Sequence, residues 1–184
     1  GLQDNYNWCG PSAVRFTRGI KNSDWYQVQG GDGFVVLADP RDNRYVYSES
    51  QDGNIQRRNR VTGEARNIRP NAGNVTGLAP NAPGFRWNWD TPIVFSPHDT
   101  GALIVAANRV FRSSDRGDSW AVISPDLTTN ADRNELQIMG VLNTQVTLSR
   151  NDGISNWPTI VSVAESPKTP GVYFTGTDDG VVSM

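Results

Sequence analysis

The chain has 184 residues, a length typical of a single domain, and its net charge of −2 arises from 17 basic and 19 acidic residues. This balance argues against nucleic acid as a partner, and no apolar run approaches the roughly 18 residues that a membrane-spanning helix needs. The single cysteine, Cys9, excludes an internal disulfide.

The composition and the first residues predict short strands joined by turns. Glycine (18), proline (11) and tryptophan (6) are frequent, a combination that favours short strands with many turns. Within residues 1–32 the run NYNWCG reads as one strand, and a connector follows it. We expect residues 1–32 to be the end of one repeating unit.

Three later segments repeat one pattern, at residues 33–68, 91–123 and 159–184. Each begins with an apolar run that ends in Asp-Pro or Ser-Pro, at Pro40, Pro97 and Pro167. A second β run follows (YVYSES, ALIVAAN, GVYFTGT), and then a third (GNIQRRN, RVFRSSD, DGVVSM). The first two segments add a fourth run at ARNI and WAVI, whereas the third stops where its turn and fourth strand should begin.

Units of about 35 residues with four antiparallel strands predict the blades of a β-propeller, an all-β fold. The first strands FVVLA, PIVFS and IVSVA are almost continuously apolar, as expected of inner strands that are buried on both faces. The alternative is a β-sandwich whose hairpins resemble one another by chance. The shared strand order and the shared X-Pro position favour the propeller.

The predicted organisation is one partial β-propeller domain over residues 1–184, with two full and two partial blades. Because the chain opens with GLQDN and closes with GVVSM, we expect it to be cut from a longer protein. The predicted parts are the end of a blade plus a connector (1–32), a blade (33–70), a connector (71–90), a blade (91–127), a connector (128–158) and an incomplete blade (159–184).

The turn SSDRGDSW, between the third and fourth strands of the second segment, has a defined spacing. Its residues Ser113, Asp115, Gly117 and Trp120 match the Asp-box pattern S-x-D-x-G-x-x-W. A turn carboxylate accepts hydrogen bonds from backbone N–H groups, glycine supplies a positive φ, and tryptophan covers apolar surface. The motif therefore predicts a structural staple, in preference to a metal ligand or a catalytic acid at Asp115.

With this motif, several phrases make the sequence resemble a family of large secreted bacterial proteins: GLQDN, GGDGFVV, YSESQDGNI, VFRSSDRGDSWAVISPDLTTN and TIVSVAESP…GTDDG. These proteins carry sortilin-type or BNR-repeat (Asp-box) propellers and are often labelled glycosyl hydrolase-like. The resemblance covers essentially all 184 residues. It implies a many-bladed propeller, commonly two in tandem, that is secreted, periplasmic or at the cell surface. More remotely, the sequence is similar to xyloglucanase and sialidase propellers.

The segments that lead into the first strands are expected to open onto the axial mouth of the propeller. They are SDWYQVQGGDG (23–33), FRWNWD (85–90) and ISNWP (154–158), and they contribute Trp25, Tyr26, Asp32, Trp87, Trp89, Asp90 and Trp157. Aromatic faces stack on sugars or peptides while polar groups orient them, so the five aromatic residues are predicted ligand contacts. The alternative is that the tryptophans wedge between neighbouring blades.

A glycoside hydrolase would need two facing carboxyl groups. Asp32 and Asp90 are the candidate catalytic pair, with Asp24 in reserve, although Asp32 in GGDG also suits the ordering of its own loop. Glu49 and Glu165 lie on or just after strands, and neither has a partner that is visible in the sequence.

The sequence as a whole favours a secreted β-propeller segment that binds a protein or a glycan at its mouth, or that acts as a structural scaffold. The alternative is part of a glycoside hydrolase with paired carboxylates at the mouth. The only histidine, His98, lies in a turn without a nucleophile elbow, so we expect no catalytic triad, no metal and no cofactor. An incomplete ring exposes a strand edge and apolar faces, so we expect the remaining blades of a longer protein, or a partner chain, to cover them.

Overall fold

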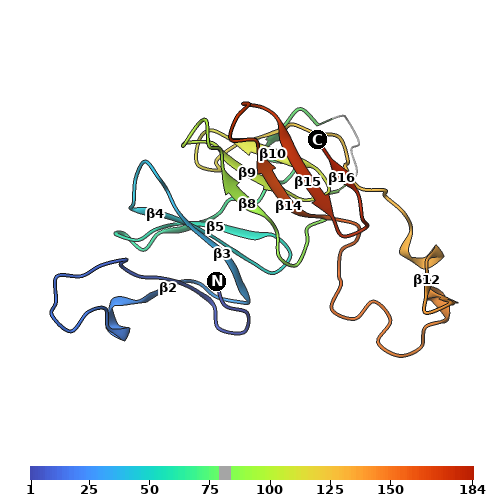
Figure 1. Cartoon of the computed structure of the whole chain (residues 1–184), viewed down its shortest axis with the longest axis horizontal. Helices are drawn as coiled ribbons and strands as arrows, with labels where there is room; N and C mark the ends of the chain where they lie inside the picture. The colour runs from blue at the N-terminus through green and yellow to red at the C-terminus, as the bar shows by residue number, and fades with distance from the viewer. Residues whose placement is uncertain (79–83) are drawn as a thin grey trace.

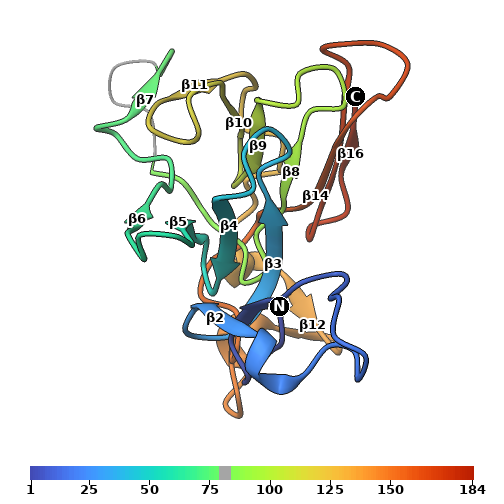
Figure 2. The same ribbon diagram turned by 90° about the vertical axis from the view of Figure 1, so that its left-hand side faces the viewer.

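A computed structural model describes residues 1–78 and 84–184 of the chain. Within these residues the fold is all-β, with short 3₁₀ turns as the only helical elements. The strands form three successive sheets, antiparallel apart from one short parallel strand in the second, and two small hairpins (Figures 1 and 2). The predicted all-β fold class is confirmed, and residues 79–83 of the predicted connector lie outside the described residues.

The first half of the chain forms a hairpin and a four-stranded sheet. In the hairpin, β1 (Asn7–Cys9) pairs antiparallel with β2 (Tyr26–Gln29), and the 3₁₀ turn η1 (Asn22–Asp24) lies in the loop between them. The first sheet is an antiparallel meander in chain order. Its strands are β3 (Gly33–Ala38), β4 (Tyr45–Ser50), β5 (Asn54–Asn59) and β6 (Ala65–Asn67).

The second and third sheets repeat this meander. The second contains β8 (Ile93–Phe95), β9 (Leu103–Ala106), β10 (Val110–Ser113) and β11 (Trp120–Val122), and β7 (Val75–Thr76) joins it in parallel beside β11. The third contains β14 (Ile160–Glu165), β15 (Tyr173–Thr177) and β16 (Val182–Ser183). Between these two sheets the chain forms η2 (Arg133–Glu135), β12 (Gln137–Ile138), β13 (Val141–Leu142) and η3 (Asn143–Gln145).

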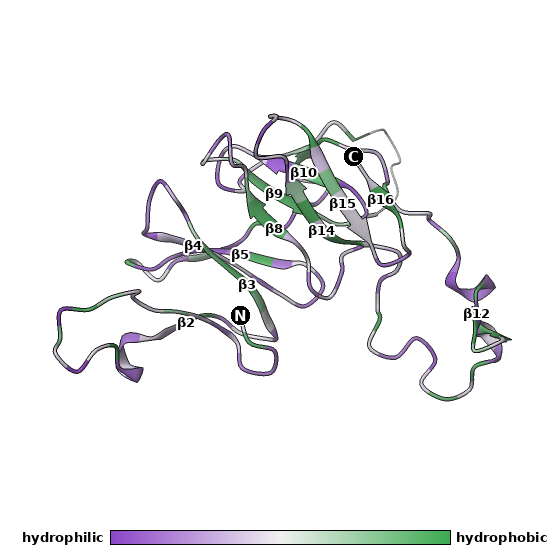
Figure 3. Cartoon of the chain, viewed as in Figure 1, coloured by the Kyte–Doolittle hydropathy of each residue, from purple (hydrophilic) through white to green (hydrophobic). Residues whose placement is uncertain are grey.

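The middle sheet is buried on both faces, as alternation along β9 makes clear. Leu103 and Val105 belong to the core that the middle sheet shares with the first sheet, whereas Ile104 and Ala106 belong to the core that it shares with the third. Figure 3 shows the apolar residues concentrated on β8, β9 and β14. Three sheets stacked face to face through two such cores are successive blades of a partial β-propeller.

The remaining segments lie outside this stack. The β1–β2 hairpin and the segment around β12 extend from opposite ends of the molecule in Figure 1, and their loops are largely polar in Figure 3. Among the described residues, no helix has the length and the apolar character needed to cross a membrane.

Candidate functional site

Three segments from different blades meet at the end of the sheets where β8 and β14 begin. They are the β4–β5 turn (51–53), the segment before β8 (84–92) and the segment before β14 (154–159), and together we call them the mouth. Hydrogen bonds join them: Ser155 Oγ donates to Asp52 Oδ1 over 2.7 Å, and Arg86 Nε donates to the Pro158 carbonyl over 2.9 Å. Of the three strand-entry segments named from the sequence, these contacts bring together 85–90 and 154–158.

Arg86 fixes the middle segment of the mouth to the second blade. Its Nη2 donates to Asp126 Oδ2 and to Thr128 Oγ1, each over 2.9 Å, and its backbone N–H donates to Asn108 Oδ1 over 3.1 Å. Burial would raise the pKa of Asp126, but the Asn108, Thr128 and Arg86 donors outweigh it and lower that pKa. The carboxyl group is thus an ionised anchor, and the segment before β8 is rigidly held.

Trp157 lines a polar hollow of about 520 Å³ at the mouth. Its indole is half-buried, so part of one surface is available to a ligand. The polar side chains around it offer both donors and acceptors: Arg86, Asp132, Arg133, Asn134, Asn151, Ser155 and Asn156. One aromatic surface among many hydrogen-bonding groups is the combination that binds a polyhydroxylated ligand such as a sugar.

A second hollow of about 410 Å³ adjoins the first, and Asn156 borders both. Its apolar wall includes Phe85 and Trp87, and its polar wall includes Asp52 and Arg69. Asp52 has a positive φ of 58°, a strained conformation for a residue with a Cβ. The two hollows together give the mouth room for an extended ligand.

The predicted aromatic contacts fall into three different environments. Trp89 is exposed (39%) beside Asp90, and Trp157 lines the hollow described above. Trp87 is only 5% exposed and stacks on Phe111 at a centroid separation of 5.9 Å. Trp87 therefore packs between blades, the alternative role for these tryptophans, and most of its surface is not available to a ligand.

Trp25 and Tyr26 lie on the N-terminal hairpin. Trp25 is 48% exposed and its ring packs against Gly10, where an added Cβ would lie 2.8 Å from a ring carbon. Tyr26 begins β2, where burial and the neighbouring Cys9 raise the pKa of its hydroxyl. Neither residue lines the two hollows of the mouth.

The three predicted aspartates also differ in their surroundings. Asp32 Oδ1 accepts the backbone N–H of Asp4 over 2.8 Å, and Asp24 Oδ2 accepts that of Lys21 over 2.7 Å. Both carboxylates therefore order loops of the N-terminal hairpin. Asp90 stays exposed at the mouth, and partial burial of its carboxyl group raises its pKa, against the lowering effect of the N-terminal ammonium group.

Glu49 is a buried carboxyl group beside the mouth, near Asp90 and Asp52, that sequence reasoning did not place there. It is 0% exposed, and neither carboxyl oxygen has a hydrogen-bond partner among the described residues. Burial raises the pKa of Glu49 to about 9, and the neighbouring carboxyl groups of Asp90 and Asp52 add to the rise. The nearby backbone N–H groups of Thr91 and Gly53 lower this pKa, but by less. Glu49 lies two residues after the core residue Tyr47 on β4 and therefore shares its face of the strand, and this period of two is the signal that could have placed it inward.

The Asp-box residues hold the turn between β10 and β11. Ser113 Oγ donates to Asp115 Oδ1 and accepts the Gly117 N–H, each over 2.8 Å. Asp115 also accepts the backbone N–H of Ser119 over 2.9 Å and its hydroxyl over 2.5 Å. Trp120 Nε1 donates to the Ile68 carbonyl of the first blade over 2.8 Å. The bonds among residues 113–119 hold the turn itself, and the Trp120 bond ties the second blade to the first.

The part of the chain that the structure describes contains no group of three or more His, Cys, Asp or Glu side chains arranged to hold a metal ion. Of the acidic residues of the mouth, Asp52 accepts the Ser155 hydroxyl.

No family model matches the sequence, and no curated protein matches it. Among solved structures, the chain is similar to the GH74 xyloglucanase from Xanthomonas campestris, with a TM-score of 0.49 and 14% sequence identity. The match covers 86% of this chain and 22% of that chain, so this chain spans about a fifth of the length of that protein.

Proposed function

We propose that this β-propeller segment is a glycan-binding module whose binding surface is the mouth. The observation that carries the proposal is the half-buried Trp157 in a hollow of about 520 Å³ that is otherwise lined mainly by polar side chains. Sugar rings stack their apolar faces on indole, and their hydroxyl groups need both donors and acceptors. We also propose an extracellular location, which rests on the resemblance of the sequence to exported proteins.

The test is calorimetric titration with neutral β-1,4-linked hexasaccharides of glucose, xylose and mannose. Trp157→Ala should weaken the binding of the preferred hexasaccharide at least about tenfold, or ~1.4 kcal/mol. Trp25→Ala is the matched control, because Trp25 is an exposed tryptophan that does not line the hollow. Equal affinities of the two variants, or no binding of any hexasaccharide, would contradict the proposal.

We propose binding without hydrolysis. A glycosidase needs two carboxyl groups that face the substrate. The Asp32 carboxylate accepts the Asp4 N–H and Glu49 has no exposed surface, which leaves Asp90 without either of these as a partner for catalysis. Prolonged incubation with the bound hexasaccharide should therefore release no shorter sugars, as chromatography of the mixture would reveal.

A further inference from the structure

A polar hollow of about 610 Å³ lies between the N-terminal hairpin and the first blade, and it shares no lining residue with the two hollows of the mouth. We call it the amide hollow, and its polar side chains include Gln27, Gln29, Ser50, Gln51, Gln56 and Arg58. In the first blade, β1 packs on β3 and β4, whereas β2 packs on β4. The amide hollow extends from β2 over β5, away from β1, so strands from the interior of the sequence form both of its walls.

The first and second blades can be aligned residue by residue at this place. In each blade, the N–H of the residue before the X-Pro proline donates over 3.0 Å to the carbonyl five residues after that proline, at Tyr45 and at Ala102. Tyr45 and Ala102 are therefore equivalent. Three residues further along the second strand, Ser48 of the first blade is equivalent to Val105 of the second.

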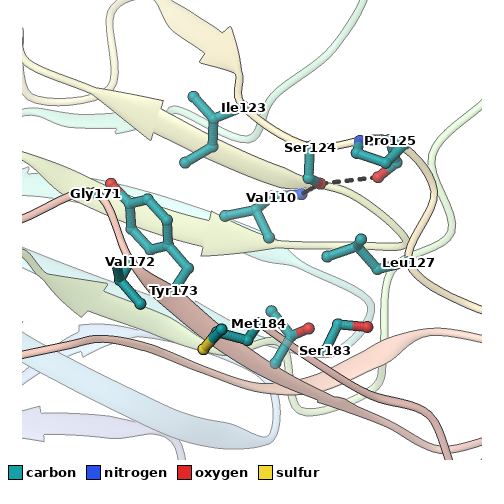
Figure 4. Close-up of a pocket in the computed structure, with 11 residues that line it drawn as sticks. Val110, Ile123, Ser124, Pro125, Leu127, Gly171, Val172, Tyr173, Ser183 and Met184 are labelled. Atoms are coloured by element: carbon teal, nitrogen blue, oxygen red, sulfur yellow. Dashed lines mark hydrogen bonds between the residues drawn. The ribbon is translucent and has the colours of Figure 1, made fainter.

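The cross-strand pairs at these positions differ in polarity. Ser48 pairs with Gln56 across β4 and β5, and Val105 pairs with Phe111 across β9 and β10. Val105 and Phe111 are buried in the apolar core between the first and second blades. Figure 4 shows that apolar side chains, Val110 among them, also line the interface between the second and third blades. The first blade thus turns a serine and a glutamine toward the hairpin where the second blade turns a valine and a phenylalanine toward its neighbour.

One wall of the amide hollow is held rigidly by its own hydrogen bonds. The Gln29 side chain belongs to a residue that is only 6% exposed, and its Nε2 donates to the Asn54 carbonyl over 2.7 Å and to Ser50 Oγ over 3.2 Å. Asn54 Nδ2 donates to the same Ser50 Oγ over 3.0 Å. Buried polar groups that bond to one another in this way keep a fixed orientation. The wall is therefore organised before a ligand arrives.

Four other side chains leave hydrogen-bonding groups for a ligand. The carboxamides of Gln27, Gln51 and Gln56 form no side-chain hydrogen bond with the described residues, and each offers a donor and an acceptor. Arg58 Nη1 makes a long hydrogen bond of 3.4 Å to the Val28 carbonyl, and the guanidinium forms no ion pair with a described acidic side chain. None of the described residues that line the amide hollow is acidic. The amide hollow therefore holds one uncompensated positive charge among groups that both donate and accept.

We propose that the amide hollow binds a uronate, a sugar unit that carries a carboxylate. The Arg58 guanidinium would hold the carboxylate through two parallel N–H···O bonds, and the carboxamides would bind the ring hydroxyl groups. The lining contains no aromatic side chain, which distinguishes this site from the hollow around Trp157. The inference is independent of neutral glycan binding at the mouth.

The test is calorimetric titration of the intact protein with β-1,4-linked diglucuronate and with α-1,4-linked digalacturonate. At least one should bind at least about tenfold more tightly than its neutral counterpart, cellobiose or α-1,4-galactobiose, in which hydroxymethyl groups replace the carboxylates. The affinity should fall as salt is added. No binding of either diuronate, equal affinity for the neutral counterpart, or equally tight binding of acetate would overturn the proposal.

Trp157→Ala separates this proposal from glycan binding at the mouth. It should leave the affinity for the diuronate within about twofold, because Trp157 does not line the amide hollow. A loss of diuronate binding in this variant would place the ligand at the mouth and overturn the proposal. Failure of the neutral hexasaccharides to bind would leave the expected diuronate result unchanged.

Arg58→Gln tests the charge, because it removes the guanidinium and keeps a hydrogen-bonding side chain. It should weaken diuronate binding at least about tenfold and leave the weaker binding of the neutral disaccharide unchanged. Arg60→Gln is the matched control: Arg60 is exposed, does not line the amide hollow, and donates its Nε to the Asn43 carbonyl over 2.7 Å. Equal losses in the two variants, with unchanged circular dichroism, would overturn the proposal.

Gln56→Phe tests the space, because it introduces the side chain of Phe111, found at the equivalent position of the second blade. It should also weaken diuronate binding at least about tenfold, and unchanged affinity in the folded variant would contradict the site. The titrations of the wild-type protein need no variant, so the proposal stays testable if a variant does not fold.

Discussion

The ionisable side chain of Glu49 is fully buried. Its folded-state pKa of about 9 lies above the ordinary value of 4.5, so the folded protein binds a proton more tightly than the unfolded chain does. The stability of the fold should then fall as pH rises from about 4.5 to about 9, by up to ~1.4 kcal/mol per pH unit. Below that window both states are protonated, and Glu49 has no effect on the pH dependence.

Glu49→Gln should therefore stabilise the protein at pH 7 by about 1–3 kcal/mol and flatten the decline of stability between pH 5 and 9. Urea denaturation at a series of pH values measures this. The control is Glu165→Gln. Burial would raise the pKa of Glu165, but the Gly171 N–H and other neighbours lower it, so this variant should lose stability above the ordinary pKa. A pH profile of Glu49→Gln parallel to that of the wild type would contradict the buried neutral carboxyl.

At the scale of the strand and turn, Gly117 has little freedom to change. It has a positive φ of 85°, and a Cβ at this position would lie 2.6 Å from Cδ1 of Ile68 in the neighbouring blade. Gly63 is its counterpart in the β5–β6 turn, with a φ of 78° and no atom within 4 Å of the added Cβ. Comparing alanine substitutions at the two glycines therefore distinguishes the cost of backbone strain from the cost of a clash between blades.

Gly63→Ala should destabilise the fold by about 1 kcal/mol through backbone strain alone, and Gly117→Ala should cost about 1–3 kcal/mol more. Thermal and urea unfolding of the two variants measure the difference. Ile68→Val removes the atom nearest the added Cβ, so it should recover part of the loss in the Gly117→Ala background. Equal costs at the two glycines would mean that the blades separate easily at this contact.

Strand order could be read from the sequence because each blade repeats its own apolar runs and turns. YVYSES coincides with β4, whereas the two-residue β7 lies in a polar connector without any pattern. The parallel pairing of β7 depends on distant partners: the Trp120 N–H donates to the Asn74 carbonyl over 2.8 Å, and Thr76 Oγ1 donates to the Trp120 carbonyl over 3.3 Å. The hydrophobic periodicity of one segment cannot predict a contact with a residue more than 40 positions away in the sequence.

At the scale of the whole molecule, the mouth could be predicted only in part. Strands of a repeated meander begin at the same end, so Trp89, Asp90 and Trp157 could be assigned to one end of the sheets from the sequence. The hollow around Trp157 also needs Asp132, Asn134 and Asn151 of the long connector, whose course is set by hydrogen bonds rather than by apolar periodicity. Likewise, nothing local distinguishes the packed Trp87 from the exposed Trp89.

An ion pair between the first and second blades also acts at the scale of the whole molecule. Asp39, at the end of β3 in the first blade, has a fully buried side chain and accepts Arg116 Nε from the Asp-box turn of the second blade over 3.1 Å. Asp39→Asn would leave the guanidinium without its buried partner, so it should cost about 3 kcal/mol of unfolding free energy, and the loss should persist at high salt.

Asp99→Asn removes a more exposed ion pair with Arg112 inside one blade and should cost less than about 1 kcal/mol. Urea unfolding followed by tryptophan fluorescence and by circular dichroism measures both. Equal costs would mean that the Asp39 to Arg116 contact has no part in fixing how the first blade sits on the second.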